Sequence, residues 1–177
     1  MSTLIYMIVF YVLAVPAFFG DVFSGVSRRA RTTGRVGTGL MMILGGAGVN
    51  ASSLASGYDY GDFADDAKFG WVTQAWRAVV PENHMLLIGL LITFEAVVGI
   101  LILLGGRPAQ VGLVLTIAFH VALGLFFSWF LTGYAAVMLV ALVLLLRTEL
   151  HPSVPVAGPA AAGPAQGVWR RHRPSHG

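Results

Sequence analysis

The sequence predicts an all-α membrane protein, a bundle of about five transmembrane helices in a single domain. Of its 177 residues, 56% are hydrophobic and only 11% are charged, whereas soluble domains carry about 25% charged residues. The mean hydropathy is +0.78, and the apolar residues gather in runs long enough to cross a hydrocarbon core of about 30 Å. We therefore expect a transmembrane helical bundle over residues 1–150 and a basic tail over residues 151–177.

Five apolar runs are the predicted spans. They cover residues 3–20, 36–55, 84–104, 109–127 and 130–146. A Gly-Gly-Arg-Pro turn separates the third run from the fourth, because Gly and Pro interrupt helices. The last two runs form one stretch that is too long for a single span. We divide it at residues 128–133, where small and polar residues interrupt the apolar pattern.

The distribution of basic residues predicts the orientation of the bundle. Cytoplasmic segments of membrane proteins are enriched in Lys and Arg. With five spans and the N-terminus outside, nine of the 11 basic residues lie on the cytoplasmic side, whereas four spans would misplace either the first cluster or the tail. The nine are Arg28, Arg29, Arg31, Arg35, Arg107, Arg147, Arg170, Arg171 and Arg173.

The two ends of the chain each leave an alternative open. The first run is short and contains small residues at Ala14 and Ala17, as a signal peptide does, but its positive cluster follows the apolar run instead of preceding it. We interpret it as a retained span, with cleavage as the alternative. The tail is rich in Pro, Ala and Gly and ends in a basic cluster, which predicts a disordered cytoplasmic segment. A specific lipid or partner contact is the alternative role of that cluster.

Residues 56–83, the outer segment, join the second and third spans and are acidic on balance. Between residues 63 and 80, apolar side chains recur at helical spacing, which predicts an amphipathic helix at the membrane surface. Trp71 and Trp76 suit the headgroup level, and Pro81 is expected to end the helix before the third span. A surface lid and a binding surface are both compatible with this pattern.

Glu95 and His120 are the strongest candidates for chemistry. Glu95 lies near the middle of the third span, where inserting a carboxylate costs about 2.5 kcal/mol or more, and such residues are candidates for function. His120 lies near the middle of the fourth span at a depth that differs from that of Glu95 by only about 3 Å. The two side chains are therefore candidates for a hydrogen-bonded pair. The alternatives are a packing hydrogen bond for Glu95, and for His120 a bond to a backbone carbonyl or to Thr116.

Asn50 is a third polar candidate, because it follows a run of small residues in the second span, where an amide can bond across a close helix contact. Packing is the alternative role. A haem between two histidines is not expected, since His84 lies at the outer boundary and His120 near the middle. The chain has no cysteine, which excludes disulfides, thiolate metal sites and dithiol chemistry. Because the basic residues flank apolar runs, we expect no nucleic-acid partner. We expect no metal site, because the acidic residues of the outer segment have no His at ligand spacing.

Several short motifs lie between Arg35 and Phe127. They are Arg35–Leu40 opening a span, Asn50 near its end, Phe63–Asp65, Trp76, Val79–Pro81, Asn83, Glu95–Gly99, and Gly106–Arg107 before another apolar helix. This stretch resembles the DoxX-like family of small bacterial integral membrane proteins. The resemblance implies a four-helix core, formed by the second to fifth spans, with the first span as an addition. It also implies a bacterial cytoplasmic membrane, and links to quinone-coupled sulfur oxidation and to membrane complexes of oxidative-stress proteins.

The sequence therefore predicts a multi-pass protein whose core encloses a small polar pocket around Glu95. We expect an accessory or anchoring subunit without a cofactor of its own, in contact with the bilayer and with a redox partner protein. The alternative is a quinone-binding subunit of an oxidoreductase, with Glu95 and His120 handling protons and Trp76 near the pocket mouth. Asn50, Trp76, Glu95 and His120 are the candidate ligand-binding residues. The sequence assigns no catalytic residue and no oligomeric state.

The five-span topology predicts a labelling pattern. A cysteine introduced at Ser56 should react with a membrane-impermeant thiol reagent added to intact cells, because the outer segment faces outward. A cysteine at Ser153 should react only after the membrane is permeabilised. The wild-type chain has no cysteine and is the blank. Labelling at Ser153 in intact cells would exclude this topology.

Overall fold

The computed structural model describes the backbone of residues 3–151 and the side chains from Val12 onward. Within this part all regular secondary structure is helical, which confirms the predicted fold class. The elements are α1 (Thr3–Val22), α2 (Arg28–Leu40), η1 (Met41–Gly48), α3 (Val49–Ala55), α4 (Gly70–Leu104), α5 (Gly106–Phe126) and α6 (Trp129–Leu150). Apart from His151, the predicted tail lies outside the described residues.

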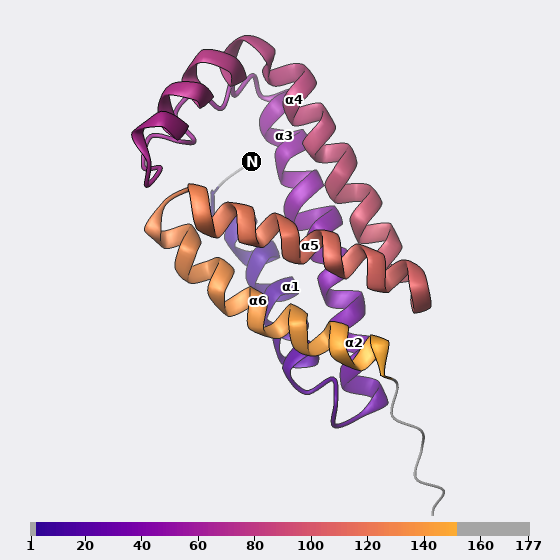
Figure 1. Cartoon of the computed structure of the whole chain (residues 1–177). Coiled ribbons are helices and arrows are strands. Elements are labelled where there is room, and N and C mark those ends of the chain that lie inside the picture. The colour runs from indigo at the N-terminus through magenta and orange to yellow at the C-terminus, as the bar shows by residue number, and fades with distance from the viewer. Residues whose placement is uncertain (1–2, 152–177) are drawn as a thin grey trace, which may run out of the picture.

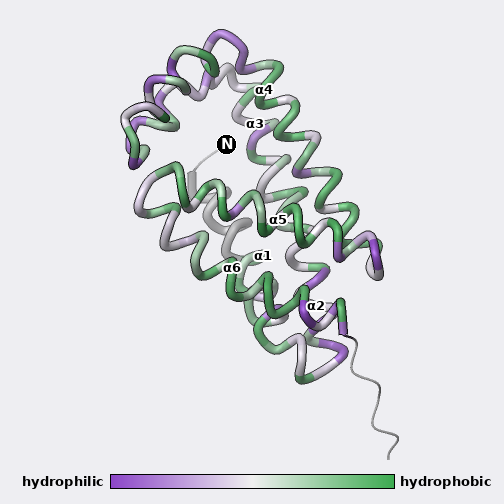
Figure 2. The backbone as a smooth tube through the Cα atoms, in the orientation of Figure 1, coloured by the Kyte–Doolittle hydropathy of each residue, from purple (hydrophilic) through white to green (hydrophobic). Residues whose placement is uncertain are grey.

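Four helices of the described part are long and apolar enough to cross a membrane, counting α2, η1 and α3 as one continuous rod, and Val12–Val22 of α1 adds a shorter apolar helical segment. Hydrophobic residues follow the helices and hydrophilic ones gather at the two ends of the molecule (Figure 2). Large apolar side chains are exposed along the helices, among them Leu86 and Leu90 of α4 and Val137 and Val140 of α6. Water would oppose this arrangement, whereas lipid favours it.

The helices form a closed ring. Along the chain, α1 packs on α2, the rod packs on α4, α4 on α5 and α5 on α6, and α6 returns to contact α1. Figure 1 shows α4 beside the rod, α5 beside α6, and the outer segment arching over one end of the bundle. The first helix, which the family resemblance implies as an addition to a four-helix core, therefore packs between α2 and α6.

Glycines let the helices approach closely at two crossings. At the crossing of α1 and α2, a Cβ on Gly20 would lie 2.3 Å from the Gly34 nitrogen. At the crossing of α2 and α4, a Cβ on Gly99 would lie 2.7 Å from the Gly39 carbonyl oxygen. Since lipid provides no hydrophobic force between helices, such small-residue contacts stabilise membrane bundles by close packing.

The second helix begins eight residues before the predicted span, at Arg28 instead of residue 36. Ser27 caps it, since its side chain accepts a hydrogen bond from the Ala30 nitrogen at 3.0 Å, and a serine N-cap favours helix initiation at this position. The four arginines of the expected inner loop therefore all lie on helix α2: Arg28, Arg29, Arg31 and Arg35.

The outer segment also differs from prediction. Its helix begins at Gly70, later than residue 63, and passes through Pro81. It is interrupted at Asn83, whose φ of −117° and ψ of 16° leave the helical region, so the surface helix breaks two residues after the expected end at Pro81 and before the third span. Proline lacks an N–H and crowds the preceding turn, and the Asn83 side chain donates to the Val79 carbonyl oxygen at 2.8 Å. A side chain thus compensates for the disturbed backbone.

Replacing Gly99 by Ala should destabilise the bundle, because the new Cβ would lie 2.5 Å from Ile43 Cγ1 as well as against the Gly39 carbonyl. Overpacking of this kind costs about 1–3 kcal/mol. Gly89→Ala on the same helix is the control, since nothing lies within 4 Å of its Cβ position. Thermal unfolding in detergent measures both variants. Equal stability of the two would contradict the close α2–α4 crossing.

Candidate functional site

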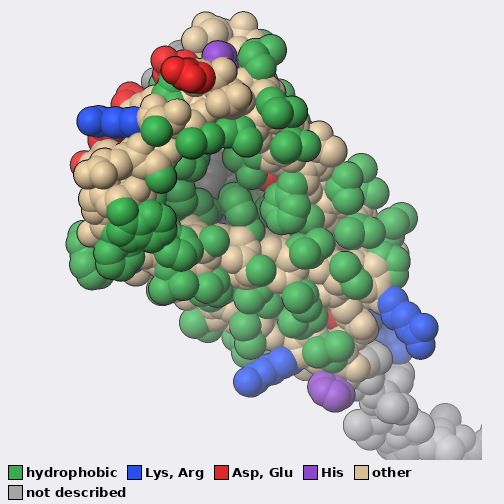
Figure 3. Space-filling view, turned by 45° about the horizontal axis from the view of Figure 1, so that its top comes forward, with side chains coloured by type: hydrophobic (Ala, Val, Ile, Leu, Met, Phe, Trp, Pro, Cys, Tyr) green, Lys and Arg blue, Asp and Glu red, His purple; other side chains and the backbone are tan. Residues whose placement is uncertain are grey.

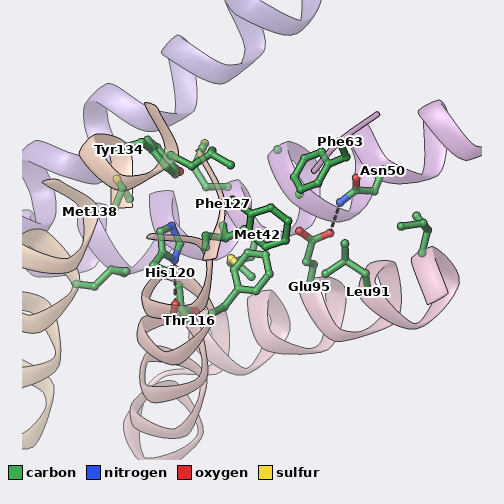
Figure 4. Close-up of a pocket in the computed structure, with 18 of the residues that line it drawn as sticks. Met42, Asn50, Phe63, Leu91, Glu95, Thr116, His120, Phe127, Tyr134 and Met138 are labelled. Carbon is green, nitrogen blue, oxygen red and sulfur yellow. Dashed lines mark hydrogen bonds between the residues drawn. The ribbon is translucent and has the colours of Figure 1, made fainter. Parts of the chain in front are cut away.

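A cavity of about 380 Å³ lies between the rod, α4, α5 and α6. Its size is at the lower end of the range of about 300–1,000 Å³ that is typical of small-molecule sites. The walls are mainly apolar and aromatic, with a few polar side chains among them (Figure 4). All four candidate residues predicted from the sequence line it: Asn50, Trp76, Glu95 and His120.

Glu95 is held on the α4 wall of this cavity and is only 4% exposed. The Asn50 side-chain nitrogen donates to its Oε2 atom at 2.9 Å, as the dashed line in Figure 4 shows. A Cβ on Gly46 would lie 2.7 Å from the Glu95 carboxyl carbon, so the glycine of η1 makes room for the carboxyl group. Within the described part, Glu95 has no ion-pair partner, and the hydrogen bond from Asn50 is made to Oε2.

A chain of hydrogen bonds ties this carboxyl group to the outer segment. The Tyr60 hydroxyl lies 3.1 Å from the Asn50 side-chain oxygen and 3.1 Å from its backbone oxygen. The Trp76 indole nitrogen donates to the Tyr60 carbonyl oxygen at 2.7 Å. Tyr60 has a φ of 61°, a left-handed conformation that costs about 1–3 kcal/mol and persists where surrounding contacts hold it. The outer segment therefore positions Asn50 for Glu95.

His120 lies on the α5 wall and does not contact Glu95. Its Nδ1 donates to the Thr116 carbonyl oxygen at 2.9 Å, which leaves Nε2 as the nitrogen available to a ligand. Figure 4 shows Met42 and Phe127 between the imidazole and Glu95. The two side chains face one cavity from different walls, and no hydrogen bond or ion pair joins them in the described part. The candidate pair is therefore absent, and the alternative for His120, a hydrogen bond to a backbone carbonyl, is observed.

The outer segment closes the cavity at one end. Phe127 at the end of α5 contacts Phe63 and Trp76, with ring centroids 5.2 Å and 5.4 Å away. Lys68 donates to the Gly124 carbonyl oxygen, and its ammonium group lies 4.7 Å from the centroid of the Trp129 ring. Aromatic contacts and one cation thus fasten the outer segment to the α5–α6 turn.

Sequence reasoning missed two buried carboxyl groups. Asp21 of α1 is fully buried and accepts a hydrogen bond from the Thr38 hydroxyl at 3.0 Å. Glu149 of α6 is 7% exposed and lies 3.5 Å from Arg31 and 3.9 Å from Arg35. Both carboxyls come just after an apolar run, where charge usually marks the membrane surface, so the sequence offered no sign of their burial. Thr38 also lines the cavity, at the end away from Asn50.

The described residues include no group of three or more His, Cys, Asp or Glu side chains able to hold a metal ion. Comparisons with protein-family models, curated proteins and solved structures gave no match. The long apolar helices of the described part place the protein in the class of multi-pass helical membrane proteins. Membership of the DoxX-like family stays a prediction from the sequence motifs.

The Asn50–Glu95 bond predicts coupling in a double-mutant cycle of Asn50→Ala and Glu95→Ala. Polar contacts in membrane bundles contribute about 0.6 kcal/mol on average and up to about 1.7 kcal/mol, so the double change should cost less than the sum of the two single changes by that amount. Unfolding in detergent measures the cycle. The cycle of Glu95→Ala with His120→Ala is the control and should be closer to additive. Larger coupling in the control cycle would contradict the observed hydrogen bonding.

Proposed function

We propose that this chain is an accessory membrane subunit that binds a small lipophilic molecule with one polar head group in the central cavity. The observation that carries the proposal is the combination of mainly apolar walls with few polar groups that point inward, the arrangement typical of small-molecule sites. Glu95 and Asn50 would hold the head group by hydrogen bonds. The aromatic side chains Phe119 and Phe127 would pack against its apolar part.

A quinone is the alternative ligand, and the position of His120 favours it. Glu95 and His120 are two titratable groups on different walls of one cavity, and a quinone carries oxygens at opposite ends of its ring. Reduction of a quinone takes up two protons and two electrons. The two side chains would exchange the protons, and a partner protein would supply the electrons. The subunit would then belong to an oxidoreductase.

The proposed setting is the bacterial cytoplasmic membrane, with the N-terminus outside and the C-terminus in the cytoplasm. Charge supports this orientation. Acidic side chains gather over the outer segment, and basic side chains project at the opposite end of the molecule (Figure 3). The positive end is expected to face the cytoplasm. The family resemblance supports the bacterial setting.

Filling the cavity should abolish ligand binding. Leu123 lines the cavity, so Leu123→Trp should displace the ligand, whereas Leu125→Trp on the same helix is the control, because Leu125 is 55% exposed and lies outside the lining. Purified protein is extracted with organic solvent and the extract analysed by mass spectrometry. Wild type and the control should release one lipophilic species per chain, and Leu123→Trp at least tenfold less. Wild-type protein that releases only membrane phospholipid would overturn the proposal.

The same extracts separate the two ligand classes. A quinone changes its ultraviolet absorption when it is reduced with borohydride, and a redox-inert lipophile does not. A quinone that is released from wild type but not from Glu95→Gln would favour the oxidoreductase subunit. A redox-inert species would favour the accessory role.

A further inference from the structure

A second hollow lies on the lipid-facing surface beside the central cavity. It is a groove of about 380 Å³ between the outer part of α4 and the end of α5. Trp71, Ala75 and Val79 line the α4 side, and Phe126 lines the α5 side. The lining side chains are all hydrophobic.

Two aromatic rings belong to both spaces. Trp76 and Phe127 line the central cavity and also line the groove. Their ring planes stand 89° apart with centroids separated by 5.4 Å, so the pair forms a partition between the polar interior and the lipid-facing surface. A molecule that extends past these rings would occupy both spaces.

The central cavity contains polar side chains and the groove is apolar, which matches the polar head and the hydrocarbon chain of an amphiphile. The central cavity holds Glu95, Asn50 and His120, whereas the groove offers a polar head group no charged side chain and only the Trp indole N–H groups. The Trp76 indole is already used, since it donates to the Tyr60 carbonyl oxygen. The cavity is at the lower end of the range for small-molecule sites, so it suits a head group better than an entire long-chain lipid.

We propose that the ligand is a single-chain amphiphile, with its polar head at Glu95 and Asn50 and its hydrocarbon chain passing between Trp76 and Phe127 into the groove. This inference rests on the proposed function and names the ligand class for the same cavity. The occupant of the groove is the chain of the ligand, because the groove and the cavity are adjacent and share the Trp76 and Phe127 rings as a common wall.

The kink in α4 suggests how such a ligand would enter. Trp76 lies on the part of α4 that precedes the non-helical residue Asn83. In this proposal, movement at Asn83 would separate Trp76 from Phe127, the residue that follows α5. The ligand would then enter sideways from the bilayer.

Tryptophan fluorescence tests the location of the chain. The protein carries Trp76 as its sole tryptophan, through Trp71→Phe, Trp129→Phe and Trp169→Phe, in nanodiscs of ordinary phosphatidylcholine. The probe is a monoacylglycerol with a dibrominated 18-carbon chain, since bromine quenches tryptophan at short range. Quenching should saturate with added probe and should be reversed by the unbrominated monoacylglycerol.

Filling the groove should weaken binding of the probe. Ala75 lines the groove, and Ala75→Phe should raise the probe concentration for half-quenching at least tenfold. Ala78→Phe on the same helix is the matched control, because Ala78 is exposed outside the groove, and it should change this concentration less than twofold. Circular dichroism and thermal unfolding confirm that both variants are folded.

Three results would overturn the inference. One is quenching that rises without saturation, which indicates bilayer lipid only. Another is saturable quenching with equal half-quenching concentrations for Ala75→Phe and Ala78→Phe. The third is a wild-type ligand without a hydrocarbon chain. The last two leave the proposed function intact, because the cavity is still occupied, whereas release of phospholipid alone from wild type refutes the proposed function.

Discussion

The three buried carboxyl groups of the described residues, Asp21, Glu95 and Glu149, all find their partners on one helical element. Hydrocarbon offers no hydrogen bonds, so each carboxyl must be satisfied by the protein. Asn50 donates to Glu95 of α4, Thr38 donates to Asp21 of α1, and arginines of α2 lie close to Glu149 of α6. The rod formed by α2, η1 and α3 thus fixes three neighbouring helices.

This arrangement explains why the cavity lies where it does. The three contacts attach α4, α1 and α6 to the rod at different heights, and α5 completes the ring without a buried carboxyl group. The side of Glu95 that Asn50 does not use therefore faces the space between the rod and α5. Removing one partner of such a contact would leave a buried polar group without a hydrogen bond, which costs more than the contact itself contributes.

Much of the architecture is readable from the sequence, because burial in lipid demands long apolar runs. The predicted third span ends at Leu104, as α4 does. The four candidate residues, chosen because polar and aromatic groups stand out in or beside apolar runs, line one cavity. The lack of a hydrogen bond between His120 and Glu95 was not predictable, since depth follows from counting residues but the positions of side chains around a cavity depend on packing. Asp21 was missed for the same reason, because its burial depends on how α1 packs against α2.

The π-helical segment η1 sets how far α3 is rotated relative to α2 around the axis of the rod. Each residue of an α-helix turns the chain by about 100°, so a straight α-helix would place Thr38 and Asn50 about 120° apart around the axis. Both residues line the same cavity instead. Hydrogen bonds from residue i to i+5 accommodate an extra residue per turn, which corrects the angular phase between the inner and outer halves of the rod. A deletion or insertion of one residue within Met41–Gly48 would therefore rotate Asn50 away from Glu95 while leaving the segment apolar.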